Sequence, residues 1–324
     1  MTTESGRSDA RILSLLPAAT EIVAALGALK QLVGITHECD YPPDVASLPR
    51  VTSSVVHADV SSSEIDAEVR ALASSGAAVF ALDVALVSRL APDLLLTQSV
   101  CDVCALPERE VDRAVAALAI HPRRVTLGAT TLDGVWEDVR RVAGAIGRSA
   151  AGDALVAELE RRMRRVHETL KAAKAPRPRV AVIEWLDPLF VAGHWTPELV
   201  RRAGGINLLA EAGTHSVQID VGVVRDAKPD VVLFAPCGFD VERAERESRA
   251  LLATREWEWA HEVESWALDG SALTSRPGPR LVDAVEVMAA IFAPTLFAAP
   301  TPRYARITAT AVRGTIVHGT RTDI

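Results

Sequence analysis

Short apolar runs alternate with helical patterns along this chain, and the same order of segments occurs twice. Apolar runs in the first half lie at residues 11–16, 32–35, 77–82 and 94–97. In each half a Pro-Asp pair, Pro92-Asp93 or Pro229-Asp230, precedes a run rich in leucine or valine. Strands and helices that alternate at this length predict a parallel sheet covered by helices on both faces. We therefore expect an α/β protein with two Rossmann-like lobes.

The longest helical pattern, residues 150–173, lies between the two halves. Arginine and glutamate occupy most of its circumference, which fits a helix that bridges two lobes, although a solvated surface helix has the same pattern. We divide the chain into a polar N-terminal segment (1–10), a first lobe (11–147), a linking helix (148–175), a second lobe (176–299) and a tail (300–324). The tail has little periodicity, so we expect it to be flexible.

Composition excludes several classes of partner. A net charge of -7 offers no basic surplus to offset phosphate, which argues against nucleic acid. The apolar stretches are interrupted well short of a membrane span, so we expect no membrane insertion. Residues 1–10 lack the apolar core of a secretory signal. We therefore expect a cytoplasmic protein, or a periplasmic one if a leader precedes this sequence.

One loop concentrates chemically useful side chains. The apolar run that ends at Ile35 is followed by residues that can ligate, titrate or stack: His37, Glu38, Cys39, Asp40 and Tyr41. Two prolines then prevent a continuing central strand or helix. Ligands bind at the carboxyl ends of strands in open parallel sheets. We interpret this loop as one wall of a ligand site, with a polar turn and an incidental cysteine as the alternative.

Other candidate ligand-binding residues follow predicted strands elsewhere in the chain. They are Gln98, Trp185, Trp195 and Arg276. Because strands of a parallel sheet end at one edge, these side chains are expected to converge with the loop at residues 37–41.

The cysteines suggest a second kind of site. Cys101 and Cys104 form a Cys-x-x-Cys pair, a spacing that suits zinc or a redox dithiol. No second close pair exists, so a zinc or iron–sulfur site built from these two with Cys39 and Cys237 requires distant loops to converge. Buried inert cysteines are the alternative.

No catalytic constellation stands out. The chain has no nucleophile elbow, no phosphate-binding Gly-Lys-Ser/Thr loop and no Gly-x-Gly-x-x-Gly. Cys39 and His37 are two residues apart, so on an extended segment they would face the same side and could serve a hydrolase or transferase. We assign no catalytic residue and expect a binding protein.

Several motifs resemble one known family. They are Ile12 to Ile22 (ILSLLPAATEI), Gly34 to Pro42, Pro92-Asp93-Leu94, Ala203-Gly204-Gly205 and Arg276 to Arg280. Together they resemble the cobalamin- and siderophore-type (class III, helical-backbone) substrate-binding proteins of ABC transporters, over residues 11–293. The closest branch is leaderless proteins labelled cobalamin-binding. The resemblance implies two α/β lobes joined by one long helix, a ligand in the cleft between them and limited hinge motion.

The resemblance also implies roles for individual residues. Tyr41 falls where cobalamin binders place a tyrosine on the corrin, and Arg276 falls at their cleft arginine. Gln98 replaces a cleft tryptophan, which leaves Trp185 and Trp195 as substitutes to cover a flat ligand. The segment 61–90 is longer than the family pattern and could cover part of the cleft.

We therefore expect a cleft-type binding protein for cobalamin or a related corrinoid or metal chelate. His37 is its candidate axial cobalt ligand and Cys39 a softer one. An ABC permease is an expected partner only if the protein is exported. A metal or iron–sulfur protein and a Cys39-dependent hydrolase or transferase remain the alternatives.

Overall fold

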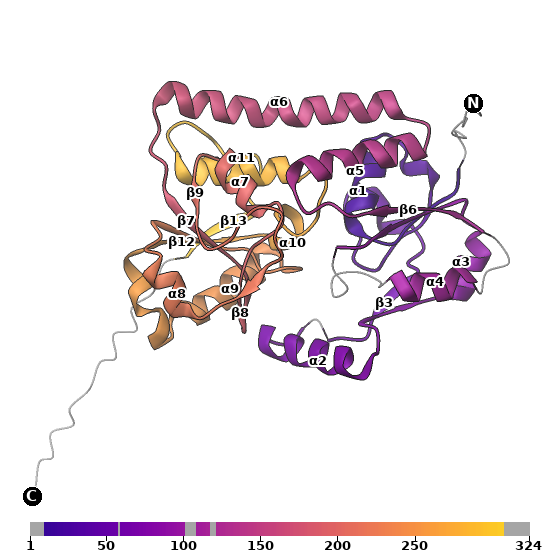
Figure 1. The fold of residues 1–324 in the computed structure, drawn as a ribbon, viewed down its shortest axis with the longest axis horizontal. Coiled ribbons are helices and arrows are strands. Elements are labelled where there is room, and N and C mark those ends of the chain that lie inside the picture. Colours follow the sequence, from indigo (N-terminus) through magenta and orange to yellow (C-terminus); the bar gives the residue numbers. More distant parts are fainter. Residues whose placement is uncertain (1–9, 58, 101–107, 117–120, 308–324) are drawn as a thin grey trace, which may run out of the picture.

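The computed structural model describes residues 10–57, 59–100, 108–116 and 121–307, which form two α/β lobes below one long helix (Figure 1). The predicted fold class, two lobes with parallel sheets joined by a single helix, is confirmed. The segments keep the predicted alternation of strands and helices.

The N-terminal lobe is built on a four-stranded parallel sheet in the order β2-β1-β5-β6. Its strands are β1 (Ile12–Ser14), β2 (Leu32–Gly34), β5 (Leu94–Gln98) and β6 (Arg123–Leu127). A separate antiparallel pair consists of β3 (Thr52–Ser54) and β4 (Phe80–Leu82). The helical segments are α1 (Pro17–Ala25), η1 (Leu29–Gln31), η2 (Pro43–Ser47), α2 (Ser62–Ser75), α3 (Val84–Leu90), α4 (Glu108–Ala116) and α5 (Leu132–Ala145).

The C-terminal lobe has a seven-stranded mixed sheet whose centre, β7, β11 and β12, is parallel. Its strands are β7 (Arg179–Leu186), β8 (Leu189–Val191), β9 (Ile206–Asn207), β10 (Val217–Gln218), β11 (Val231–Phe234), β12 (Glu264–Leu268) and β13 (Tyr304–Ile307). The helical segments are α7 (Thr196–Arg202), α8 (Val221–Asp226), α9 (Val241–Leu252), η3 (Arg255–Glu262), α10 (Gly270–Leu273) and α11 (Leu281–Phe292). The antiparallel strands β8, β10 and β13 lie toward the edges of this sheet.

The long helix α6 (Ser149–Ala173) lies along both lobes (Figure 1). At its start, Arg148 donates a hydrogen bond of 3.0 Å to the Leu26 carbonyl at the end of α1. Further along, Arg162 forms ion pairs with Asp283 at 2.7 Å and with Glu286, both on α11. The helix is therefore fastened to each lobe, as a bridge requires.

One hydrophobic core crosses the boundary between the lobes. It includes Ile22 of α1, Val139 of α5, Leu199 of α7 and Val285 of α11, all buried. Since separating the lobes here would expose packed apolar surface, this core resists hinge opening.

Part of the expected flexible tail is ordered. Within residues 300–324, Tyr304–Ile307 forms β13, which pairs antiparallel with β12 and closes the edge of the C-terminal sheet. Ile307 is buried in the core of that lobe. The expectation of a loose tail is wrong for these four residues. They are ordered by hydrogen bonds to β12, a strand that is distant in the sequence.

We predict that Ile307→Ser lowers the free energy of unfolding by about 3 kcal/mol, since it deletes buried apolar atoms and buries a hydroxyl. The neighbouring Arg306→Ser is the control, because Arg306 is exposed and its Glu264 contact is 3.7 Å long. It should change stability by less than about 0.5 kcal/mol in the same urea titration. Equal effects of the two substitutions would contradict the placement of β13.

Candidate functional site

A buried ion cluster joins the two lobes between the carboxyl ends of their sheets. Glu21 on α1 is 3% exposed and accepts hydrogen bonds from Arg276 at 3.2 Å and from Arg280 Nε at 2.8 Å. Both arginines come from the loop before α11 and are 9% exposed. Buried charges require partners. Each group of this cluster has one on the other lobe.

Arg276 is also bound by groups around the loop at residues 36–41. It forms an ion pair with Asp40 and donates hydrogen bonds to the Glu38 carbonyl at 3.1 Å and to Ser271 Oγ at 2.9 Å. Burial alone would lower the pKa of Arg276, but Asp40 and Glu21 raise it overall, so the guanidinium stays charged. These bonds occupy the guanidinium of Arg276 within the chain and hold the lobes together, while its expected contact with a ligand stays a prediction.

Close packing of two loops positions Ser271. A side chain at Gly270 would meet the Pro236 carbonyl oxygen at 2.1 Å, so this position requires glycine. The loop after β11, which carries Cys237, therefore lies against the start of α10, which carries Ser271.

The loop at residues 36–41 is held in shape by Arg50. One terminal nitrogen of its guanidinium, Nη1, lies 3.2, 2.8 and 3.0 Å from the carbonyl oxygens of Thr36, His37 and Cys39. The Cys39 amide also donates to the Thr36 carbonyl at 3.3 Å, which makes the segment a turn. Consecutive side chains therefore point in different directions.

Cys39 points into the core. It is 1% exposed, and its Sγ lies 3.1 Å from Thr20 Oγ1 and 3.2 Å from Thr36 Oγ1. Burial raises the pKa of the thiol more than these hydrogen bonds lower it. Expectations for Cys39 as a cleft ligand, metal ligand or nucleophile are wrong, because a buried neutral thiol is neither accessible nor activated.

Asp40 and Glu38 are exposed, and their surroundings shift their pKa values in opposite directions. Although partial burial would raise the pKa of Asp40, its hydrogen bonds and ion pair with Arg276, helped by the charge of Arg280, lower it overall. Loss of solvent raises the pKa of Glu38 despite the opposing charge of Arg276, and the charge of Asp40 raises it further. Both carboxyl groups are accessible to a molecule that arrives from solvent.

His37 is half-buried beside β3 and β4. Its Nδ1 lies 2.7 Å from Thr52 Oγ1, and its ring centroid lies 5.3 Å from that of Phe80. Burial, and then the charge of Arg50, lower the pKa of the imidazole, so at neutral pH the ring is uncharged. A neutral imidazole with one nitrogen hydrogen-bonded is the form in which histidine binds metals.

Tyr41 lies over Arg280. The guanidinium carbon is 4.4 Å from the ring centroid, and Tyr41 is 40% exposed. The ion cluster thus fixes the ring while leaving part of its surface open. Arg280 and Glu21 were not predicted as site residues. The signal for them was weak, since a glutamate in the first turns of a helix and a second arginine after Pro-Gly-Pro have many ordinary explanations.

The other predicted ligand residues have separate settings. Trp195 is 6% exposed and donates from Nε1 to the Thr274 carbonyl at 2.8 Å, so it supports the loop that carries Arg276 and does not face the cleft. Trp185 is half-buried, with its ring 5.4 Å from that of Phe239. Gln98 is half-buried at the carboxyl end of β5.

The predicted four-cysteine site gains no support. Cys101 and Cys104 lie outside the described residues, Cys39 is in the core, and Cys237 is a half-buried free thiol. Within the described part of the chain, no group of three or more His, Cys, Asp or Glu side chains is arranged to hold a metal ion. Likewise, none of the described helices is both long and apolar enough to cross a membrane.

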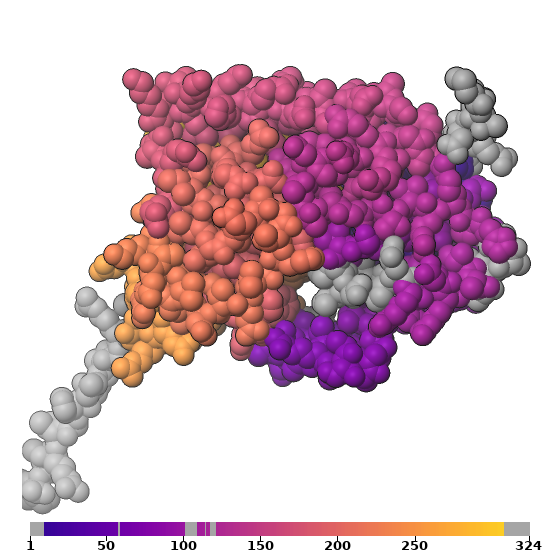
Figure 2. All heavy atoms as spheres, in the orientation of Figure 1, coloured from indigo at the N-terminus to yellow at the C-terminus, as the bar shows by residue number. Residues whose placement is uncertain are grey.

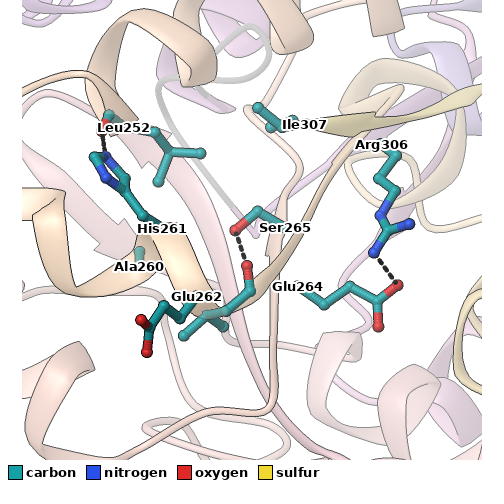
Figure 3. A pocket seen from close by; sticks show the side chains of 9 residues that line it. Leu252, Ala260, His261, Glu262, Glu264, Ser265, Arg306 and Ile307 are labelled. Atoms are coloured by element: carbon teal, nitrogen blue, oxygen red, sulfur yellow. Dashed lines mark hydrogen bonds and ion pairs between the residues drawn. The ribbon is translucent and has the colours of Figure 1, made fainter. Parts of the chain in front are cut away.

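A cavity of about 370 Å³ lies at the opposite end of the C-terminal sheet (Figure 3). Its wall includes Glu264, the first residue of β12, whereas the ion cluster follows the last residue of that strand. His261 Nε2 is 2.9 Å from the Leu252 carbonyl, and Arg306 is 3.7 Å from Glu264 (Figure 3). Because these polar groups already have partners, we do not take this cavity as the ligand site.

Two lobes fastened below one bridging helix, with polar loops meeting between their sheets, define a cleft-type binding protein. The chain belongs to the periplasmic binding protein family, whose model matches residues 12–259. It is 24% identical to a vitamin B12-binding protein of Vibrio cholerae over 277 residues, which cover 85% of this chain and 86% of that protein.

Solved structures share the fold. A periplasmic heme binding protein from Pseudomonas aeruginosa superposes with a TM-score of 0.69 at 22% identity, covering 92% of this chain and 98% of that one. The periplasmic vitamin B12 binding protein of Vibrio cholerae gives a TM-score of 0.61 at 21% identity, covering 88% and 97%. Staphylococcus aureus IsdE complexed with heme gives 0.65 at 17% identity, covering 88% and 99%.

Glu21→Gln should lower the free energy of unfolding by about 3 kcal/mol or more, because it leaves two buried arginines without their shared carboxylate. Asp153→Asn is the control, since its ion pair with Arg140, between α6 and α5, is exposed. Urea denaturation measures both variants. A loss for Glu21→Gln no larger than for Asp153→Asn would contradict a structural role for the cluster.

Asp40 predicts a pH dependence. The pKa of Asp40 is lowered in the folded protein. The Asp40–Arg276 ion pair therefore stabilises the fold at pH values above 3.8, the ordinary pKa of this group, and this stabilisation is lost as the pH falls through the folded pKa. The stability gap between the wild type and Asp40→Asn should be constant from about pH 7 to about pH 5 and close on further acidification. Urea midpoints across this range test the sign, and a gap that widens toward acid would refute it.

Proposed function

We propose that this protein binds a flat metal-containing tetrapyrrole, cobalamin or heme, in the cleft between its lobes and delivers it to an ABC permease. The observation that carries the proposal is the partly open ring of Tyr41, fixed on Arg280 beside the lobe boundary. A flat ring held rigidly with part of its surface open suits stacking on a planar ligand. The names of the relatives, vitamin B12-binding and heme-binding, support this ligand class.

The polar groups near Tyr41 suit the rim of such a ligand. The Asp40 carboxylate and the Glu38 carboxyl are exposed beside the buried arginines. Carboxylates accept hydrogen bonds from the amide side chains at the edge of a corrin but repel the propionates of heme. This charge pattern favours cobalamin over heme.

His37 is the candidate axial ligand. Its Nδ1 contact with Thr52 orients the ring and leaves Nε2 for a metal. The lowered pKa keeps the ring in its ligating form above acidic pH. Metal binding by His37 is separable from stacking on Tyr41, because a coordinate bond alters the absorption spectrum and stacking alone does not alter it in the same way.

Titrations with hydroxocobalamin and with hemin, followed by visible absorption and by co-elution on a sizing column, test the proposal. We expect cobalamin to bind and to elute with the protein. Tyr41→Ala should weaken binding about ten-fold through lost stacking. Tyr304→Ala is the matched control, because Tyr304, the other tyrosine of the chain, lies on β13 beside Trp266. The affinity of this variant for cobalamin should match that of the wild type.

The spectra then separate the two contributions. His37→Ala should remove the spectral shift while part of the affinity remains, since the stacking surface is intact. Binding of hemin alone would reassign the ligand within the class. Co-elution of neither compound would reject the proposed function.

A further inference from the structure

Helix α2 belongs to the N-terminal lobe by connectivity but packs on the other lobe. It is carried between β3 and β4, and among the described elements none packs against it as extensively as β7 of the C-terminal lobe. Figure 1 shows α2 below the gap between the lobes, and Figure 2 shows the surface hollowed between α2 and the C-terminal lobe. The helix therefore crosses the side of the cleft opposite α6.

Specific contacts fasten α2 to the C-terminal lobe. Arg243 of α9 donates a hydrogen bond of 2.6 Å to the Val60 carbonyl just before α2. Arg70 of α2 donates one of 3.3 Å to Gln218 of β10. Ile65 packs against the C-terminal core cluster, on which Trp185 also packs. Three separate positions along the segment thus hold it across the boundary.

The strength of this attachment is modest. Ile65, Val69 and Leu72 share one face of the helix by their spacing, and each is only half-buried. A helix of 14 residues is marginally stable in water without packing, even with the capping box of Ser61 and Glu64. An element with few buried contacts opens at low free-energy cost compared with the shared core below α6.

The base of α2 is linked to the candidate axial ligand. His37 bonds to Thr52 of β3 and contacts Phe80 of β4, the two strands from which α2 extends. A ligand bound at His37 would therefore lie at the root of the segment that crosses the cleft.

We propose that residues 60–75 form a strap that closes the mouth of the interlobe cleft, and that its release from the C-terminal lobe sets the rate of ligand entry and exit. The gating step rests on the proposed function. Because the buried ion cluster and the shared core hold the lobes together, the strap moves while the lobes keep their relative position.

Hydrogen exchange of the full ligand-free chain, followed by mass spectrometry, tests the strap without any ligand. The double variant Ile65→Ser, Arg243→Met removes two attachments, and Ile65→Ser alone serves as a milder version on a half-exposed site. Amides of residues 62–75 should exchange about ten-fold faster in the double variant, while those of α6 keep the wild-type rate. Two controls should match the wild type: Ala71→Ser on an exposed position of α2, and Glu247→Gln, which removes the Arg243–Glu247 ion pair but keeps the bond to Val60.

Stopped-flow absorption with hydroxocobalamin and with hemin tests the gate. The double variant should raise the association and dissociation rates together by about ten-fold and change Kd by less than about three-fold, because the strap limits passage more than it binds. Unchanged exchange in residues 62–75 would overturn the strap. Faster exchange with unchanged ligand rates would overturn the gate. Absence of binding to the wild type would reject the proposed function and with it the gate, while the exchange result still decides whether the strap exists.

Discussion

The buried carboxylate of Glu21, shared by Arg276 and Arg280, is the interaction on which the arrangement of the two lobes depends. A carboxylate and two guanidinium groups out of water are costly unless the carboxylate pairs with both cations, so the cluster forms only when the lobes meet in one relative position. The same arginines then organise the surface above them. Arg276 positions Asp40 and the Glu38 backbone, and Arg280 supports the ring of Tyr41. A structural cluster thereby becomes the floor of the candidate ligand site.

Because the two lobes are held rigidly together, motion is expected in the segment at residues 60–75. The shared core and the two anchors of α6 resist separation of the lobes, as one long bridging helix would be expected to do. The segment that crosses the cleft is held less firmly, since its apolar face is half-exposed and its attachments to the C-terminal lobe include hydrogen bonds of Arg243 and Arg70 and the packing of Ile65. The structure thus combines a fixed floor with a weakly held cover.

The sequence predicts the repeated pattern of strands and helices well, because local periodicity and turn residues determine each segment. It predicts long-range pairing poorly. Nothing in the sequence near Tyr304 indicates that a strand begins there, because β13 forms by pairing with β12, which is distant in the sequence. Residues 37–41 form a loop after a strand, as predicted, but alternation along an extended segment predicts that His37 and Cys39 share a side. The turn closed by the Cys39 amide separates them and sends the thiol into the core. Likewise the resemblance assigns Arg276 to the ligand, whereas its bond to Glu21 could not be predicted, because the two residues are 255 positions apart and Glu21 carries no local mark of that role.

We propose that the tetrapyrrole lies between the carboxyl edges of the two sheets, above the ion cluster of Glu21, Arg276 and Arg280. The most direct measurement is an anomalous difference map, at the cobalt or iron edge, from crystals of the protein with hydroxocobalamin or hemin. One strong peak is expected between the lobes, on the His37 and Tyr41 side of the ion cluster and enclosed by α2. A peak at the β12–β13 cavity, or elsewhere on the surface with the cleft empty, would contradict it.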